Sequence, residues 1–273
     1  MALGVGRMQN AVKYNLAVRG VRLVIQRLLA WLETVGDVIL FFAGCLGRVL
    51  QPPYRLGNMI QVFEFVGVGS LPIVLITGVF TGAVFAIQTA VAFEIFNAKS
   101  LIGGSVVLAL VRELAPSLTA LMVAGRVGSS ITTELGTMRV TEQIDALETM
   151  AVDPLHYLVS PRILACVTLM PMLTIGFNAV GLMGAYVVCT GMLGIDKAMF
   201  FSRIYAWVTP SDIWCSLVKG LAFGAVVGAI ACYKGYFATG GSRGVGKATT
   251  STVVTSSVTV LIVDYMITTF WMR

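Results

Sequence analysis

The chain has 273 residues, of which 57% are hydrophobic and only 12% are charged. Soluble domains carry about 25% charged residues, so this composition excludes an ordinary soluble protein and favours one membrane domain with several spanning helices. The formal net charge is +6. The basic residues lie at the ends of apolar segments, where they orient a membrane protein, so we do not expect a nucleic-acid partner.

The first part of the chain has a helical stripe of polar residues between positions 12 and 33. Its polar residues are Asn15, Arg19, Arg22, Gln26 and Glu33. A basic amphipathic pattern of this kind predicts a helix that lies in the membrane interface. The apolar run 38–47 is too short to span and predicts an elbow segment. We therefore expect interfacial helices on the cytoplasmic side over residues 1–64 and a transmembrane domain over residues 65–273.

Apolar runs with few or no charges predict five transmembrane helices. They are Phe65–Phe93, Leu101–Gly125, Ile163–Ile195, Ile213–Tyr233 and Ala248–Met272. Each run exceeds the roughly 20 residues that cross the hydrocarbon core. The first and third are longer than one crossing needs, so we expect tilt, kinks at Pro72 or Pro171, or extension beyond the bilayer.

Positive charge predicts the orientation of these helices. With the N-terminus in the cytoplasm, 13 basic residues face the cytoplasm and four face outward, namely Lys99, Lys197, Arg203 and Arg273. Short cytoplasmic loops carry the excess of Lys and Arg in membrane proteins. The sequence therefore predicts an all-α, multi-pass protein of the inner (cytoplasmic) membrane, with the N-terminus inside and the C-terminus outside.

Four ionisable residues lie inside the predicted spans: Arg112, Glu113, Lys219 and Asp264. Each costs about 2.5–3.5 kcal/mol at the bilayer centre, so they should face a protein interior or a wet cavity. Lys219 and Asp264 lie at similar depth and could pair, while either Arg112 or Lys219 could neutralise Glu113. Pro116 removes a backbone hydrogen bond one turn after Arg112 and should disturb the helix there. The four residues form either a structural ion-pair network or the lining of a path for a charged or zwitterionic substrate.

A short acidic helix is predicted between the second and third spans, over residues 141–150. Glu142, Asp145 and Glu148 recur every third residue, while Ile144, Leu147 and Ala151 share another face. Thr141 is the expected N-cap. The segment is either an ordinary surface helix or a docking helix that buries Ile144 and Leu147 against a cytoplasmic partner.

Small residues line the end of the second run and predict helix packing in the membrane, with homodimerisation as one version of it. They are Gly125, Gly128, Ser129, Ser130, Thr132 and Thr133. The segment Gly241–Ala248 fits G-x-x-x-x-G-K but has alanine where a P-loop needs a hydroxyl, and it follows a membrane helix. We expect a flexible basic loop there and no ATP site in this chain.

Chemistry carried by cysteine or histidine is not expected. The five cysteines have no C-x-x-C spacing and are interpreted as small apolar packing residues. The single histidine, His156, lies in a polar loop and is expected to be solvated. The sequence thus predicts no catalytic residue, no metal and no cofactor of its own.

Longer motifs in the same region resemble a known family. They are Arg112-Glu113-Leu114-x-Pro116, Ala124-Gly125-Arg126, Glu134-Leu135-Gly136, Thr141-Glu142-Gln143-Ile144, Met150-Ala151-Val152-Asp153-Pro154, Ser160-Pro161-Arg162 and Gly244-Val245-Gly246-Lys247. Together they closely resemble the MlaE/YrbE permeases, the membrane subunits of Mla/Mce lipid ABC transporters. The resemblance runs from about Phe65 to the end of the chain.

The resemblance implies a homodimeric permease that moves phospholipid between the inner and outer membranes and so maintains outer-membrane lipid asymmetry. It implies a cytoplasmic ABC ATPase that binds the ATP and an MCE-domain protein on the outer face. Glu142, Ile144, Asp145, Leu147 and Glu148 would belong to a coupling helix that docks on the ATPase. Arg112, Glu113 and Lys219 match charged positions that line the family's lipid cavity, and Asp264 lies in its final helix.

Two other classes stay open on the residues alone. A proton- or ion-coupled carrier or channel would use Glu113 and Asp264 as titrating sites and would show pH-dependent flux without any ATPase. A membrane scaffold that only anchors partners would tolerate the removal of Glu113 and Lys219.

Overall fold

The computed structural model describes residues 33, 36–45, 47–48, 56–96, 98 and 101–271. The chain forms two compact units, residues 1–44 and residues 45–273. A short apolar helix, Gly36–Cys45, is too short to span a membrane, as the sequence predicts for this region. The predicted interfacial helix over residues 12–33 lies outside the described residues except for Glu33, and the predicted division after residue 64 stays a prediction.

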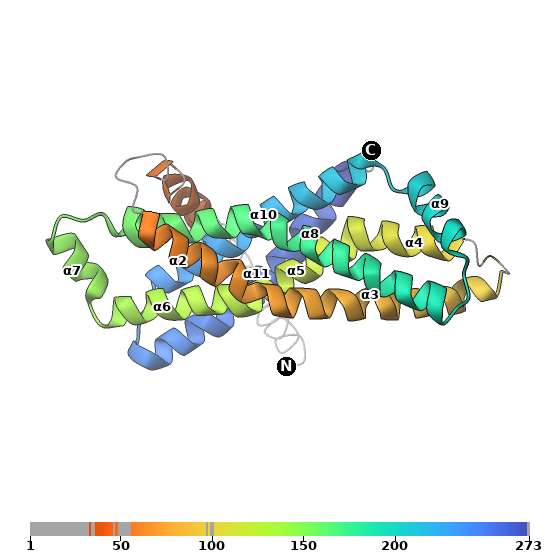
Figure 1. The fold of residues 1–273 in the computed structure, drawn as a ribbon. Helices are drawn as coiled ribbons and strands as arrows, with labels where there is room; N and C mark the ends of the chain where they lie inside the picture. The colour runs from red at the N-terminus through yellow and green to blue at the C-terminus, as the bar shows by residue number, and fades with distance from the viewer. Residues whose placement is uncertain are drawn as a thin grey trace, which may run out of the picture. The chain divides into compact units, whose positions relative to one another are not determined.

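Five helices of the second unit are long and apolar enough to cross a membrane (Figure 1). They are Gly57–Glu94, Ile102–Val140, Leu155–Gly191, Pro210–Tyr236 and Gly241–Trp271. The shortest has 27 residues, or about 40 Å at 1.5 Å per residue, so each exceeds the roughly 30 Å hydrocarbon core. The chain is therefore a multi-pass membrane protein, and every element in its described residues is helical.

The first span is interrupted close to its start. Helix α2 (Leu56–Val66) ends just before Gly67, the single turn η1 (Val68–Ser70) follows, and α3 (Leu71–Glu94) continues the span. Pro72 lies in the first turn of α3, where its missing N–H costs nothing. Arg126 fixes the break, because its Nη1 donates to the Phe65 carbonyl (3.1 Å) and to Ser70 Oγ (2.8 Å).

The second span contains two π-helical turns. Its elements are α4 (Ile102–Ala109), η3 (Leu110–Leu114), α5 (Ala115–Val123), η4 (Ala124–Gly128) and α6 (Ser129–Val140). Pro116 lies in the first turn of α5, directly after the η3 turn. The proline therefore disturbs the helix where the sequence predicts it, and the result is a wider turn that carries Arg112 and Glu113. Turns of this type are frequent at functional sites.

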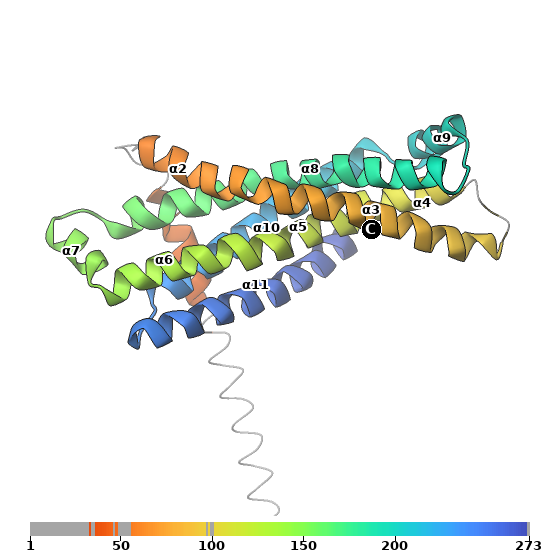
Figure 2. The ribbon, with the colours of Figure 1, turned by 60° about the horizontal axis from the view of Figure 1, so that its bottom comes forward.

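The remaining elements complete the bundle. They are α7 (Gln143–Thr149), the π-helical turn η5 (Leu155–Val159), α8 (Ser160–Gly191), α9 (Lys197–Trp207), α10 (Pro210–Tyr236) and α11 (Gly241–Trp271). Figures 1 and 2 show α7 and α9 at opposite ends of this unit. The last helix begins at Gly241, so the expectation of a flexible loop over Gly241–Ala248 is wrong. These residues form the first two turns of α11 and do not follow a strand.

Helix α10 lies at the centre of the unit, because 67% of its most apolar stretch of 18 residues is buried, against 11% of the corresponding stretch of α11. It packs closely on α8, because a Cβ atom on Gly224 would overlap the Cys166 carbonyl. In the same way, a Cβ atom on Gly82 in α3 would overlap the Gly181 carbonyl of α8. Glycine at these positions lets the backbones approach, which is how membrane helices gain packing contacts.

Part of the predicted strip of small residues packs within the chain, whereas Gly125 is exposed and has open space around it. Thr132 is fully buried, and its hydroxyl contacts Thr252 Oγ1 of α11 and the Ala231 carbonyl of α10, both at 3.0 Å. Thr133 pairs with Thr249 at 2.9 Å. These hydroxyls therefore join α6 to α10 and α11.

Candidate functional site

A cluster of charged side chains joins three spans. Lys219 of α10 is fully buried, and its Nζ lies 2.7 Å from Glu113 Oε2 and 2.8 Å from Asp264 Oδ1. The same Nζ donates to the Arg112 carbonyl at 2.9 Å. The predicted pairing of Lys219 with Asp264 is confirmed, and of the two cations considered for Glu113 it is Lys219 that makes the bond.

The backbone of the η3 turn helps to place Lys219. In a regular α-helix the Arg112 carbonyl would accept a hydrogen bond from residue 116, which is proline and has no N–H. Lys219 supplies a donor to that carbonyl. The ammonium therefore lies within 2.9 Å of one carbonyl and two carboxylates, which is the charge pairing that a buried cation requires.

Arg112 belongs to the cluster through a residue that the sequence analysis did not single out. Its Nε donates to Asp212 Oδ1 at 2.6 Å. Asp212 is the third residue of α10 and forms a capping box with Thr209, whose N–H and hydroxyl both donate to Asp212 Oδ2 (2.8 and 2.9 Å). Thr268 of α11 also donates to Glu113 Oε1, at 3.1 Å.

Of these two residues, Asp212 has a clear signal in the sequence and Thr268 has little. Thr209-Pro210-Ser211-Asp212 precedes an apolar run, and a Thr followed by an acidic residue three positions later is a helix-start pattern that places a carboxylate in the first turn. Asp212 was passed over because the predicted span begins one residue later. Thr268 lies one turn after Asp264 and so shares its helix face, but a lone threonine in an apolar run carries little signal.

A cavity of about 450 Å³ opens beside this cluster. Its lining residues are Arg112, Glu113, Thr209, Ser211, Asp212, Cys215, Thr268 and Trp271. The side chains of Arg112 and Glu113 are 33% and 40% exposed, whereas Lys219 is fully buried. The cavity therefore exposes the guanidinium of Arg112 and the carboxylate of Glu113. Lys219 and Asp264 do not line it; the ammonium of Lys219 pairs with the carboxylates of both Glu113 and Asp264.

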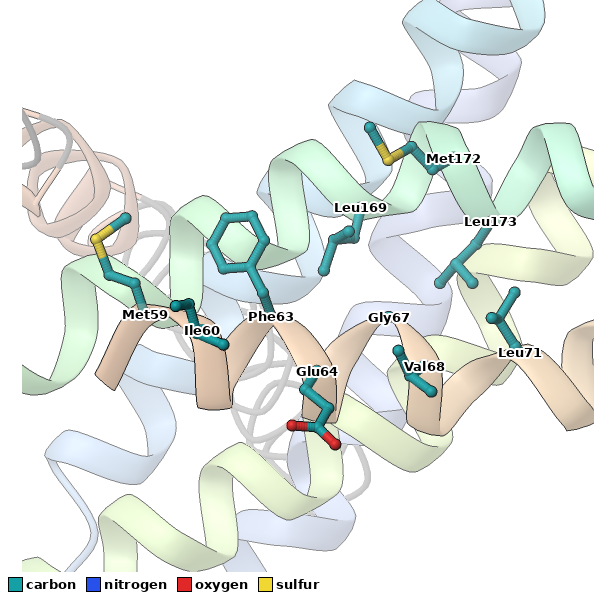
Figure 3. A pocket seen from close by; sticks show the side chains of 10 residues that line it. All are labelled: Met59, Ile60, Phe63, Glu64, Gly67, Val68, Leu71, Leu169, Met172 and Leu173. Carbon is teal, nitrogen blue, oxygen red and sulfur yellow. The ribbon is translucent and has the colours of Figure 1, made fainter. Parts of the chain in front are cut away.

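A second, larger cavity of about 580 Å³ lies where α2 and α3 meet α8. Its lining residues are Met59, Ile60, Phe63, Glu64, Gly67, Val68, Leu71, Leu169, Met172 and Leu173. Figure 3 shows side chains of the two walls facing one another, with the Glu64 carboxylate turned away from those of α8. Apolar walls of this kind suit hydrocarbon chains.

The acidic helix α7 lies at the end of the unit opposite α9 and is attached by polar contacts. Arg139 Nη1 lies 2.5 Å from Asp145 Oδ1, and the Tyr236 hydroxyl at the end of α10 donates to Glu148 Oε1 at 3.4 Å. Glu142, Asp145 and Glu148 are all exposed. Helix α7 is therefore joined to α6 and α10 while its acidic side faces outward.

Two expectations about α7 need correction. Thr141 does not cap it: the Thr141 hydroxyl donates back to the Thr137 carbonyl of α6, and the residue before α7 is Glu142, in the left-handed region with φ of 59°. Ile144 is fully buried within its own chain, so it holds α7 in place and offers no surface. Leu147 is partly exposed, so it still offers apolar surface at this end of the unit, as does the exposed Met150 directly after α7.

Cysteine and histidine take structural positions. All five cysteines are free and buried, which confirms their interpretation as packing residues. Burial raises the pKa of the Cys45 thiol to about 11, so this group is neutral at pH 7. His156 is partly exposed, and its Nδ1 lies 3.0 Å from the Arg48 carbonyl, so this side chain has a backbone partner as well as access to solvent. No cluster of His, Cys, Asp and Glu in the described residues could hold a metal ion.

Comparison with known proteins assigns this arrangement to a family. Residues 59–270 match the family described as Permease MlaE. The chain belongs to the MlaE permease family. A probable ABC transporter permease protein of Rickettsia conorii is 42% identical over 248 residues, which is 91% of this chain and 96% of the relative. A Synechocystis protein of the same description is 40% identical over 89% of both chains.

A plant relative widens the comparison. The chloroplastic protein TRIGALACTOSYLDIACYLGLYCEROL 1 of Arabidopsis thaliana is 36% identical to this permease over 226 residues, which cover 83% of this chain and 65% of the relative. The family match runs from α2 almost to the end of α11, so it contains the charged cluster, α7 and all the residues that line the polar cavity except Trp271. The chain is thus a permease subunit of the type found in ABC transporters.

Proposed function

We propose that this permease moves phospholipid between the inner and outer membranes, as a homodimer in the inner membrane with its N-terminus in the cytoplasm. The observation that carries the proposal is the cavity at the Arg112–Glu113 turn, which exposes a guanidinium and a carboxylate between membrane spans. A phospholipid headgroup with phosphate and amine presents the complementary pair of charges. The cavity between α2 and α8 has a mostly apolar lining, which suits the acyl chains of a phospholipid.

The energy for transport would come from a partner. The segment that fits a P-loop by spacing is the start of an α-helix, so it lacks the loop that cradles phosphates. We therefore assign ATP hydrolysis to a cytoplasmic ABC ATPase that docks on α7, and we place an MCE-domain protein on the outer face. On this proposal Glu142, Asp145, Leu147 and Glu148 meet the ATPase, and Ile144 supports them from beneath.

Contacts of α7 suggest how docking would reach the spans. The Arg139–Asp145 pair joins α7 to the end of α6, and the contact between Tyr236 and Glu148 joins it to the end of α10. Helix α10 runs without interruption from Tyr236 back to Asp212. ATP binding would then shift α10 and with it the charges beside the cavity, so that the dimer alternates between states that hold and release the headgroup.

The test is purification of the tagged permease from native membranes, with ATPase assay and lipid mass spectrometry on the eluate. Leu147→Arg places a long cation on the outward face of α7, and the control Met199→Arg introduces the same residue at an exposed apolar position of α9. We expect ATPase activity and phospholipid to co-purify with wild type and with the control. Leu147→Arg should lose the ATPase and keep the lipid.

A permease that elutes without ATPase activity, or an ATPase that is indifferent to Leu147→Arg, would contradict the docking assignment. The ion-coupled alternative predicts pH-dependent flux in liposomes that contain the permease alone. Such flux, together with the absence of bound phospholipid, would replace this proposal.

A further inference from the structure

Asp212 binds Arg112, which supplies a guanidinium to the lining of the polar cavity. Its carboxylate is only 4% exposed, while Arg112 is 33% exposed. Both oxygens are engaged, since Oδ1 accepts from Arg112 Nε and Oδ2 accepts from the N–H and the hydroxyl of Thr209. Oδ2 of the carboxylate is therefore fixed by hydrogen bonds at the start of α10, and Oδ1 accepts the hydrogen bond from Arg112.

The hydrogen bond to Asp212 leaves the two terminal nitrogens of the Arg112 guanidinium available. Four of the five arginine N–H donors are on the terminal nitrogens. Within the described part of the chain, the terminal nitrogens of Arg112 make no hydrogen bond, and the bond to Asp212 uses Nε alone. Two terminal nitrogens side by side match two oxygens of a phosphate group.

The neighbouring carboxylate is the obvious competitor for Arg112. Glu113 is next in sequence, but its oxygens accept from Lys219 and Thr268. Arg112 and Glu113 therefore have separate partners, one at the start of α10 and the other between α10 and α11. This division prevents the two exposed charges from neutralising each other across the cavity.

We propose that Asp212 is a positioning residue of the permease, which holds Arg112 by Nε so that its terminal nitrogens can bind the phosphate of a lipid headgroup. The inference rests on the proposed lipid transport. Its competitor is a purely structural role, because Asp212 also belongs to the capping box at the start of α10.

A double-mutant cycle separates these roles. Wild type, Asp212→Asn, Arg112→Gln and the double variant are purified from native membranes with their partners. Affinity is measured for a fluorescent phosphatidylethanolamine and for a fluorescent diacylglycerol, which lacks the phosphate. The control Asp196→Asn makes the same change at another helix start, where Asp196 accepts from the Met199 N–H at 3.2 Å and lies outside the cavity.

If Asp212 acts through Arg112, the two changes are not additive. We expect Arg112→Gln to weaken phosphatidylethanolamine binding about 10- to 100-fold, as for loss of a charged hydrogen-bond pair. Asp212→Asn should weaken it about 3- to 30-fold in wild type and less than about twofold in the Arg112→Gln background. Diacylglycerol binding should be unchanged throughout, as should both affinities in the Asp196→Asn control.

Equal losses from Asp212→Asn in both backgrounds, or equal losses for both lipids, would assign Asp212 to helix capping alone and overturn the inference. A silent Asp212→Asn would overturn it as well. Displacement of the phospholipid by excess inorganic phosphate would assign the site to free phosphate instead. If wild type binds no phospholipid, the proposed function fails and the inference falls with it, whereas an additive cycle in a lipid-binding permease removes only the role of Asp212.

Discussion

Replacing Lys219 with methionine tests whether the charges inside the spans must compensate one another. Lys219 is fully buried, and its ammonium lies within 2.8 Å of one oxygen each of Glu113 and Asp264. Methionine is similar in length and carries no charge. The variant therefore leaves two carboxylates between the spans with no cation between them, which is more costly than removing the whole group.

The expected loss follows from the burial of Lys219. Removing one partner of a buried ion pair costs about 3–5 kcal/mol, while replacing every member by neutral residues is often close to neutral. For a domain of this size about 1 kcal/mol shifts the melting temperature by about 2–4 °C. Lys219→Met should therefore melt about 6–20 °C below wild type. The triple variant Glu113→Gln, Lys219→Met, Asp264→Asn should recover most of that difference.

The assay is thermal unfolding of the purified permease in one detergent, with bound phospholipid measured on the same samples. A Lys219→Met variant that melts with wild type would refute the reasoning, as would a triple variant no more stable than the single one. A stable triple variant that has lost its phospholipid would show that the charges serve the substrate. One that keeps its phospholipid would assign them to structure.

Three further outcomes follow from the packing of the helices. Thr132→Val should lower the free energy of unfolding by about 0.5–1.5 kcal/mol, because the Thr132 hydroxyl joins three helices. A smaller loss, measured by unfolding in SDS, would contradict this prediction. Gly224→Ala should cost about 1–3 kcal/mol, because the new methyl group would meet the Cys166 carbonyl. Gly246→Ala, which has open space around it in α11, is the control and should melt no lower than wild type, because alanine favours a helix over glycine. An impermeant maleimide should not label the native protein at pH 7, since all five thiols are buried and the pKa of Cys45 is raised to about 11. Rapid labelling before denaturation would show that these thiols are accessible in the native protein and would contradict the prediction.

The spans could be predicted because charge is expensive in a bilayer, so that charge-free runs mark the helices. The predicted ends were less accurate. The second span continues from Gly125 to Val140, because the hydroxyls of α6 find partners on α10 and α11 and need no water. The last span starts at Gly241, where residues that look like a glycine-rich loop form helix; of these, Val245 is buried and lies against Gly136 of α6.

The site was predictable as a group of charges and not as a set of pairs. Depth along the helices brought Lys219 and Asp264 together, since 1.5 Å per residue is a fixed rule. Arg112 was harder, because its partner Asp212 lies at a helix start, outside the predicted span. Ile144 illustrates another limit: one face of a short helix can serve its own chain or a partner, and periodicity does not distinguish them.

The shared contact of Lys219 with a backbone carbonyl has a consequence for how relatives of this chain can diverge. Pro116 leaves the Arg112 carbonyl without its usual helical donor, and the lysine side chain two spans later fills that role. Loss of the lysine is then more tolerable in a lineage that has first replaced the proline and restored a regular turn. The two positions should change together in an alignment of permeases, although they are 103 residues apart in the sequence.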